Sequence, residues 1–214
     1  MALSKADFNN INITPAASKK LKWNSAADGF EAGDLGGSMV LLSTQTASSS
    51  SAISFTSGID DTYDEYVFKF INIHPATDGV DFEFQADTGT NTNYNQTITS
   101  TTFRATHDEA GSSTDLGYRT SEDQANGTAF QDLNIGMGND NDQSLNGTLQ
   151  IFSPSSSTFV KHFIARIASP KNNDYHVDWF CAGYFNTTTA LTRVQFKFAS
   201  GNIDAGIIKM YGIT

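Results

Sequence analysis

The residue types that most often carry chemistry are few in this chain, and their spacing matches no catalytic pattern. The four histidines are His74, His107, His162 and His176, and no two of them have the spacing of a metal-binding motif. A Ser-His-Asp triad of the hydrolase type needs a nucleophile on a strained turn, and the sequence contains no G-x-S-x-G element. His162 and His176 fall on expected strands, and the sequence leaves open whether they face each other.

Clustered carboxylates could serve two further chemistries. Asp140 and Asp142 have the i, i+2 spacing of calcium ligands, but the glycine and the bidentate glutamate of an EF-hand loop are missing. We interpret residues 138–142 as a solvated turn, and whether Asp140 and Asp142 bind a cation stays open. The acids between residues 60 and 65 could form a pair for glycoside hydrolysis, yet acids at strand entries usually serve solubility. The sequence therefore predicts no catalytic residue, no metal and no cofactor.

The thiol and the aromatic rings are interpreted through their surroundings. Cys181 is the single cysteine and lies in the aromatic run WFCAGYF, which predicts a buried, unreactive thiol. Most of the 16 Phe, 7 Tyr and 2 Trp fall at alternating positions typical of a core. Tyr94 and Tyr118 instead lie in polar segments, so we expect both to be exposed. With Arg119 they are the candidate contacts to a receptor or a glycan.

The residues named above must be positioned by strands, and residues 64–86 have the alternating pattern that predicts two of them. Two alternating segments flank the turn His-Pro-Ala-Thr-Asp-Gly. In the first segment Tyr66, Phe68 and Phe70 share one face, and in the second Val80, Phe82 and Phe84 alternate with polar residues. Such alternation is typical of an antiparallel sheet with one wet face.

The same alternation recurs to the C-terminus, and no helical period of useful length accompanies it. The later segments with this pattern are residues 159–168, 175–185, 191–198 and 203–213. Several short strands with turn signals between them indicate a sandwich. The sequence predicts an all-β fold, an antiparallel β-sandwich of jelly-roll type with an irregular N-terminal arm.

Two segments differ in character from the expected strands. Residues 1–37 carry scattered apolar side chains among glycines, and we interpret them as a docking arm preceding a sandwich domain of residues 38–214. Trp23, Phe30 and Leu35 are the candidate assembly contacts, since large apolar groups are stabilised by about 1.5–3 kcal/mol each when buried. Residues 107–128 are polar and turn-rich, which predicts a long excursion that carries recognition.

Composition excludes several classes of partner. The formal net charge of −10 argues against nucleic acid, which requires a basic stripe. No apolar run approaches the roughly 20 residues that span a bilayer, so we expect no membrane insertion. The first residues contain no apolar stretch of the kind found in secretory signals. We therefore expect synthesis and folding in a reducing cytoplasm.

Two stretches resemble a known group of proteins. Residues 198–213 read FASGNIDAGIIKMYGI, and a closing Ser-Gly…Gly-x-Ile-x-Met/Leu-Tyr-Gly strand resembles the end of many virion structural proteins of tailed bacteriophages. Residues 64–84, with the core E-Y-x-F-x-F-x-N-I-H-P, are similar to the same group, especially to proteins from phages of aquatic bacteria. The resemblance covers most of residues 38–214 in pattern, and only these two stretches in recognisable residues.

The resemblance implies a β-sandwich subunit of a phage particle and brings no catalytic or metal-binding residues. It implies a location in the virion, synthesis in the bacterial host cytoplasm, and partners among capsid or tail proteins and copies of the chain itself. We expect a non-enzymatic, multi-copy surface subunit of the head-decoration type that docks through residues 1–37. The alternative is a receptor- or glycan-binding module of a tail or fibre, with a host-surface glycan as partner. A polysaccharide-degrading enzyme is a third reading, and it would need carboxylates converging in a cleft.

Overall fold

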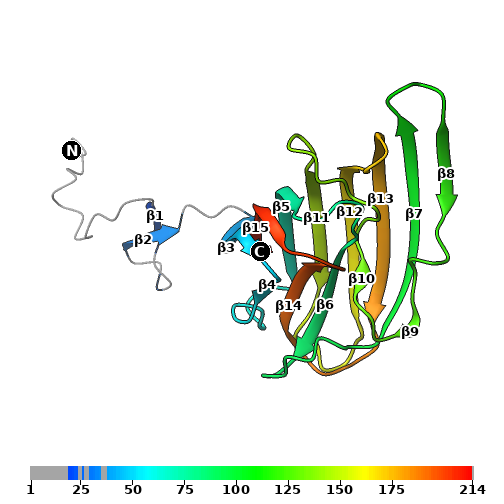
Figure 1. Cartoon of the computed structure of the whole chain (residues 1–214). Helices are drawn as coiled ribbons and strands as arrows, with labels where there is room; N and C mark the ends of the chain where they lie inside the picture. The colour runs from blue at the N-terminus through cyan, green and yellow to red at the C-terminus, as the bar shows by residue number, and fades with distance from the viewer. Residues whose placement is uncertain (1–18, 24–25, 27–28, 35–37, 214) are drawn as a thin grey trace, which may run out of the picture. The chain divides into compact units, whose positions relative to one another are not determined.

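The computed structural model describes residues 19–23, 26, 29–34 and 38–213 (Figure 1). The chain divides into two compact units, residues 1–40 and residues 41–214. Every named strand pair in the described residues is antiparallel, and these residues contain no helix. The all-β antiparallel prediction is confirmed.

The first unit contains a short β-hairpin. Strand β1 (Lys19–Trp23) pairs with β2 (Phe30–Asp34), and Trp23 lies directly opposite Phe30. The hairpin is a regular element where the sequence analysis expected none. Each strand has only five residues, too few for an alternating pattern to stand out among the surrounding glycines.

The larger sheet has the strand order β3-β15-β5-β11-β12-β13-β7-β8, and β9 pairs with β7 beside this path. Its strands are β3 (Met39–Ser50), β5 (Glu65–Pro75), β7 (Ile98–Asp108), β8 (Thr114–Tyr118), β9 (Ala125–Gly127), β11 (Leu145–Phe152), β12 (Lys161–Pro170), β13 (Tyr175–Phe185) and β15 (Ile203–Ile213). Strands β13 and β15 have the bounds that the alternation predicted. Strand β3 begins with apolar residues and continues through a segment rich in Thr and Ser.

The smaller sheet has the order β10-β6-β14-β4 and lies across the larger one (Figure 1). Its strands are β4 (Ile53–Phe55), β6 (Phe82–Thr88), β10 (Gln131–Asp132) and β14 (Leu191–Phe198). Aromatic rings from both sheets interlock between them, for example Phe70 of β5 with Phe82 of β6 at a centroid distance of 5.4 Å. This packing confirms the β-sandwich, and the jelly-roll topology stays a prediction.

The core follows the predicted alternation, with departures that include Gln85 and Asp87 of β6, both fully buried. Tyr66, Phe68 and Phe70 are buried, as expected for the inward face of β5. Gln85 falls on the face of β6 expected to be wet, yet it is fully buried. Its Nε2 donates hydrogen bonds to the carbonyl oxygens of Gln96, Thr128 and Ala129. A covering segment, which the pattern of β6 alone does not report, therefore shields this part of the smaller sheet.

The expected excursion at residues 107–128 is partly regular. Strand β7 continues to Asp108, and β8 folds back on it as the last strand of the sheet (Figure 1). The Asp108 carboxylate accepts hydrogen bonds from the Ser112 hydroxyl and from the backbone N–H groups of Ser112 and Ser113, which close the turn. These bonds lower the pKa of Asp108. Residues 107–128 thus add two short strands, β8 and β9, which both pair with β7 at the edge of the sheet.

Candidate functional site

Two of the three predicted receptor contacts lie side by side at the end of β8. Tyr118 is 52% exposed, and its hydroxyl donates to the Asp123 carboxylate. Arg119 is partly buried and forms an ion pair with Asp115. The exposure expected of Tyr118 is confirmed, whereas Arg119 is engaged within the protein.

The third predicted contact, Tyr94, is not at the surface. Its side chain is 6% exposed, and its backbone has a φ of 47°. The backbone N–H of Tyr94 donates to the buried Asp87 carboxylate at 2.9 Å, and this carboxylate also accepts from Thr88 and Gln96. The expectation that Tyr94 is exposed is wrong, because the carboxylate of Asp87 draws this polar segment inward.

An aromatic ridge crosses the outer face of the larger sheet. The register places Tyr118 of β8 opposite Phe103 of β7, Phe103 opposite Phe180 of β13, and Phe180 opposite Arg166 of β12. The Phe103 and Phe180 rings stack at 4.7 Å with an interplanar angle of 5°. The Arg166 guanidinium lies 4.9 Å from the Phe180 ring centroid and pairs with both carboxylate oxygens of Asp178. Cation–π contact and the ion pair hold the ridge together.

Sequence reasoning missed this ridge. The alternating pattern assigned most of the aromatic rings to the core, and neither Phe103 nor Phe180 was named as an exposed candidate. Phe103 is 43% exposed, and the buried positions of β7 are instead taken by Ile98, Ser100 and Thr102. The available signal was that Ser100 and Thr102 share the phase of Ile98, which places Phe103 on the other face of β7.

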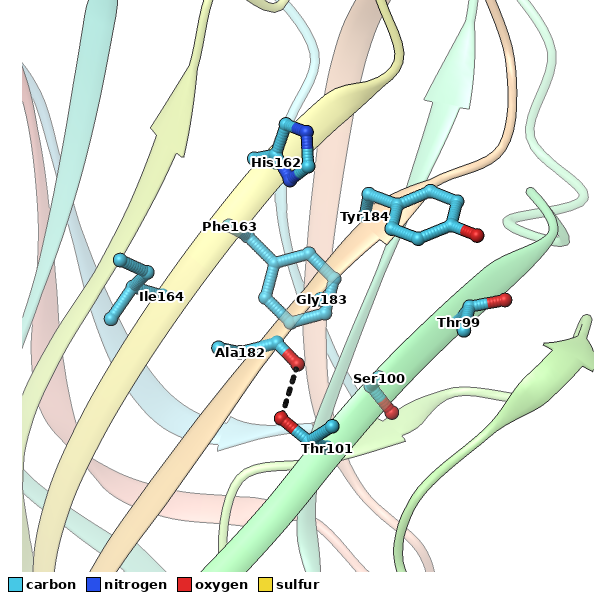
Figure 2. A pocket seen from close by; sticks show the side chains of 9 residues that line it. All are labelled: Thr99, Ser100, Thr101, His162, Phe163, Ile164, Ala182, Gly183 and Tyr184. Atoms are coloured by element: carbon cyan, nitrogen blue, oxygen red, sulfur yellow. Dashed lines mark hydrogen bonds between the residues drawn. The ribbon is translucent and has the colours of Figure 1, made fainter.

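A hollow of about 470 Å³ adjoins this ridge on the same sheet (Figure 2). Its floor includes Ala182 and Gly183 of β13, and the Phe163 ring lies against Gly183, its partner across the strands (Figure 2). The remaining lining residues are Thr99, Ser100, Thr101, His162, Ile164 and Tyr184. The volume lies within the range of about 300–1,000 Å³ typical of small-molecule sites. An apolar floor with hydroxyl and imidazole groups at its rim suits a ligand with both apolar and polar faces.

The histidines and the cysteine do not form a reactive group. His162 pairs with Tyr184 across the strands, and His176 lies opposite His107 and Pro170, so His162 and His176 do not face each other. Cys181 is buried, as predicted, and burial raises the pKa of its thiol to about 12. A thiol with this pKa is protonated at neutral pH and is a poor nucleophile.

The acidic segments stay apart from these features. Asp140 and Asp142 are exposed in the turn before β11, where the Asp140 carbonyl oxygen lies 3.2 Å from His74 Nε2. The Asp60 carboxylate accepts hydrogen bonds from the backbone N–H of Thr62 and from the hydroxyl of Tyr66. Hydrogen bonds from Thr62 and Tyr66 lower the pKa of Asp60. Within the described ranges, no group of three or more His, Cys, Asp or Glu side chains is arranged to hold a metal ion.

The hairpin of the first unit exposes its aromatic side chains. Trp23 and Phe30 stack at a centroid distance of 4.4 Å, and they are 61% and 42% exposed. Leu21, also exposed, is two residues from Trp23 and shares its face. On the opposite face Lys22 pairs with Glu31 at 3.1 Å. The third predicted assembly contact, Leu35, lies outside the described residues.

Comparison with protein-family models, with curated protein sequences and with solved structures finds no match to this chain. The part of the chain that the structure describes contains no helix that could span a membrane.

Proposed function

We propose that this chain is a non-enzymatic structural subunit of a tailed-phage virion, present in many copies on the particle surface and docking through its N-terminal arm. The observation that carries the docking role is the apolar face of the hairpin, on which Trp23 and Phe30 stack and are both exposed. A two-stranded hairpin is marginally stable in water by itself. Contact with a partner would cover its aromatic face and stabilise it. The virion assignment is supported by the resemblance of residues 64–84 and 198–213 to phage structural proteins.

Replacement of Trp23 and Phe30 by serine is expected to abolish incorporation into particles. Burial of each ring contributes about 1.5–3 kcal/mol, so loss of both weakens docking by about 100-fold or more. The measurement is the copy number of the chain per particle, by quantitative mass spectrometry against the major capsid protein. The matched control replaces Lys22 and Glu31, on the opposite face of the same hairpin, by serine. Normal incorporation of the aromatic variant would disprove arm docking, and absence of the unmodified chain from particles would disprove the virion role.

The second candidate is recognition of a host-surface glycan by the outer face of the larger sheet. The observation that favours it is the hollow beside the aromatic ridge, because a sugar ring presents apolar C–H faces and polar hydroxyls together. Ala182 on the floor and Thr99 and Thr101 at the rim offer both kinds of contact.

Filling the hollow is expected to remove this recognition. Ala182→Trp places a large ring in the hollow from an exposed position, and binding to a glycan array or to host cells should fall at least 10-fold. Ala168→Trp is the matched control, since Ala168 is also an exposed alanine of the outer face but lies outside the hollow. Equal glycan binding by the two variants, or no glycan binding by the unmodified chain, would contradict the recognition function.

A further inference from the structure

A second, polar cavity of about 240 Å³ lies beside the β7–β8 hairpin, away from the hollow described above. Arg104 directly follows Phe103 on β7, and successive side chains of a strand point to opposite faces of the sheet. The cavity and the aromatic ridge therefore lie on opposite faces of β7. The residues that line the cavity are Arg104, Thr106, Ser113, Asp115, Lys171, Asn173 and Tyr175. Three of these residues carry hydroxyl groups, one carries an amide, one carries a carboxylate, and two carry positive charges. The cavity is small enough for a single sugar ring or a smaller group.

The two positive charges have no carboxylate partner within the described part of the chain. Neither Arg104 nor Lys171 forms an ion pair there, whereas Arg119, Arg166 and Lys197 each do. The Nε and Nη1 atoms of Arg104 are buried without a hydrogen-bond partner. Charged groups in such positions are normally paired, because removing them from water costs free energy.

The charged groups near Arg104 and Lys171 do not neutralise these two cations. Burial lowers the pKa of Arg104, and repulsion by Arg119 lowers it further. Burial and repulsion by Arg104 and Arg119 likewise lower the pKa of Lys171. Asp115 lines the cavity but is paired with Arg119.

Two more acids act on the cation pair from a distance. Glu122 raises the pKa of both cations and Asp81 that of Lys171, while Asp115 raises that of Arg104. Among the described residues, none of these acids forms an ion pair with Arg104 or Lys171, and Asp115 pairs with Arg119. A bound anion would supply the missing partner.

We propose that this cavity binds the carboxylate of an acidic sugar residue of a host-surface polysaccharide. Arg104 and Lys171 hold the carboxylate, and the hydroxyl and amide groups of Ser113, Tyr175 and Asn173 bind the sugar hydroxyls. Charge supports this choice, because a chain with a formal net charge of −10 repels anions except where unpaired cations gather. The inference rests on the second candidate function, glycan recognition, and is independent of docking through the arm.

The first test uses the full chain and four probes: glucuronate, glucose, sulfate and phosphate. Isothermal titration calorimetry is expected to show glucuronate binding at least 10-fold more tightly than glucose, and saturating glucuronate should raise the thermal unfolding temperature. The affinity should fall as salt concentration rises, because the contact is between charges. Binding of sulfate or phosphate without glucuronate would overturn the sugar assignment, and equal affinity for glucose and glucuronate would overturn the role of the cations.

Two variants on different segments test the residues. Arg104→Gln and Lys171→Gln are each expected to weaken glucuronate binding at least 10-fold while the circular dichroism spectrum stays unchanged. Using both keeps the test decisive if one of them fails to fold. Lys69→Gln is the matched control, because Lys69 is a cation of the same sheet that lies over Tyr211 and outside this cavity. Unchanged glucuronate binding by both cavity variants would disprove the site.

The glycan array separates failure of this inference from failure of the recognition function. Neutral glycans that bind and are lost in Ala182→Trp, with no acidic glycan bound, would leave the recognition function standing and disprove the acidic-sugar site. No glycan bound at all would disprove both.

Discussion

Replacement of Phe196 by alanine is expected to lower the free energy of unfolding by about 3–5 kcal/mol. Phe196 lies on β14 at the centre of the sandwich and is fully buried. Its ring lies within 5.1–6.3 Å, centroid to centroid, of the rings of Phe55, Phe68, Phe70, Phe82 and Phe84. These rings come from both sheets and interlock around it, so the cavity left by alanine cannot collapse without moving several strands.

The measurement for Phe196→Ala is equilibrium unfolding in guanidinium chloride, with the free energy extrapolated to water. Phe159→Ala is the matched control, since Phe159 is 72% exposed and its loss should change stability by less than about 0.5 kcal/mol. A loss below about 1 kcal/mol for Phe196→Ala would show that this ring is not the centre of the core. Similar losses for the two variants would contradict the assignment of Phe159 to the surface.

The second large effect is a dependence of stability on pH that comes from Asp132. Burial raises the pKa of this carboxyl to about 7, and the neighbouring acids Asp81, Glu83 and Glu122 contribute to the increase. Asp132 of β10 lies directly opposite Glu83 of β6, so two carboxyl groups meet across the strands. The Lys197 ammonium lies 2.6 Å from Glu83, which leaves the negative charge of Asp132 without a close partner.

The direction of the effect follows from proton counting. Between the ordinary pKa of 3.8 and the folded value of about 7, the folded protein holds a proton on Asp132 that the unfolded chain has released. Folding is therefore increasingly disfavoured as pH rises from about 4 to about 7, and the loss is complete above pH 7. One pKa unit corresponds to about 1.4 kcal/mol, so the group lowers stability by about 2–4 kcal/mol at pH 8 relative to pH 4.

Asp132→Asn removes the titration and keeps the size of the side chain. We expect the stability difference between this variant and the unmodified chain to grow from near zero at pH 4 to about 2–4 kcal/mol in favour of the variant at pH 8. Urea unfolding across this pH range measures it, and NMR titration of the Asp132 carboxyl carbon reports the pKa directly. Parallel stability curves for the two proteins would show that Asp132 ionises normally in the folded state.

Local alternation predicted the sandwich well, since the pleat of a strand imposes a two-residue period on burial. The apolar phase of residues 191–198 became the inward face of β14, with Val194, Phe196 and Phe198 all buried. The same rule failed at strand ends. Phe159 shares the phase of Phe163 but precedes β12, so it is exposed.

Buried polar groups show where the alternation rule stops. Lys161 lies on the inward-facing side of β12 and is fully buried, although lysine side chains are almost never fully buried unless they are paired. Its ammonium donates to the carbonyl oxygens of Ser156, Phe159 and Thr187, which belong to the two loops flanking this end of β12 and β13. The Thr187 carbonyl group comes from 26 residues further along the chain, so the sequence around Lys161 carries no sign of this contact.

The candidate sites divide along the same line. The sequence by itself determined that the chain is all-β, which residues of a strand share a face, and that Tyr118 is exposed. These are local properties, because they depend on the period and the composition of a single strand. Only the tertiary structure determined that the aromatic ridge forms, where the hollow at Ala182 lies, and that Arg104 and Lys171 line the same cavity. Each of these depends on cross-strand register between segments far apart in the chain, as between Phe103 and Phe180. Register is set by the packing of the whole sandwich, and no local pattern contains it.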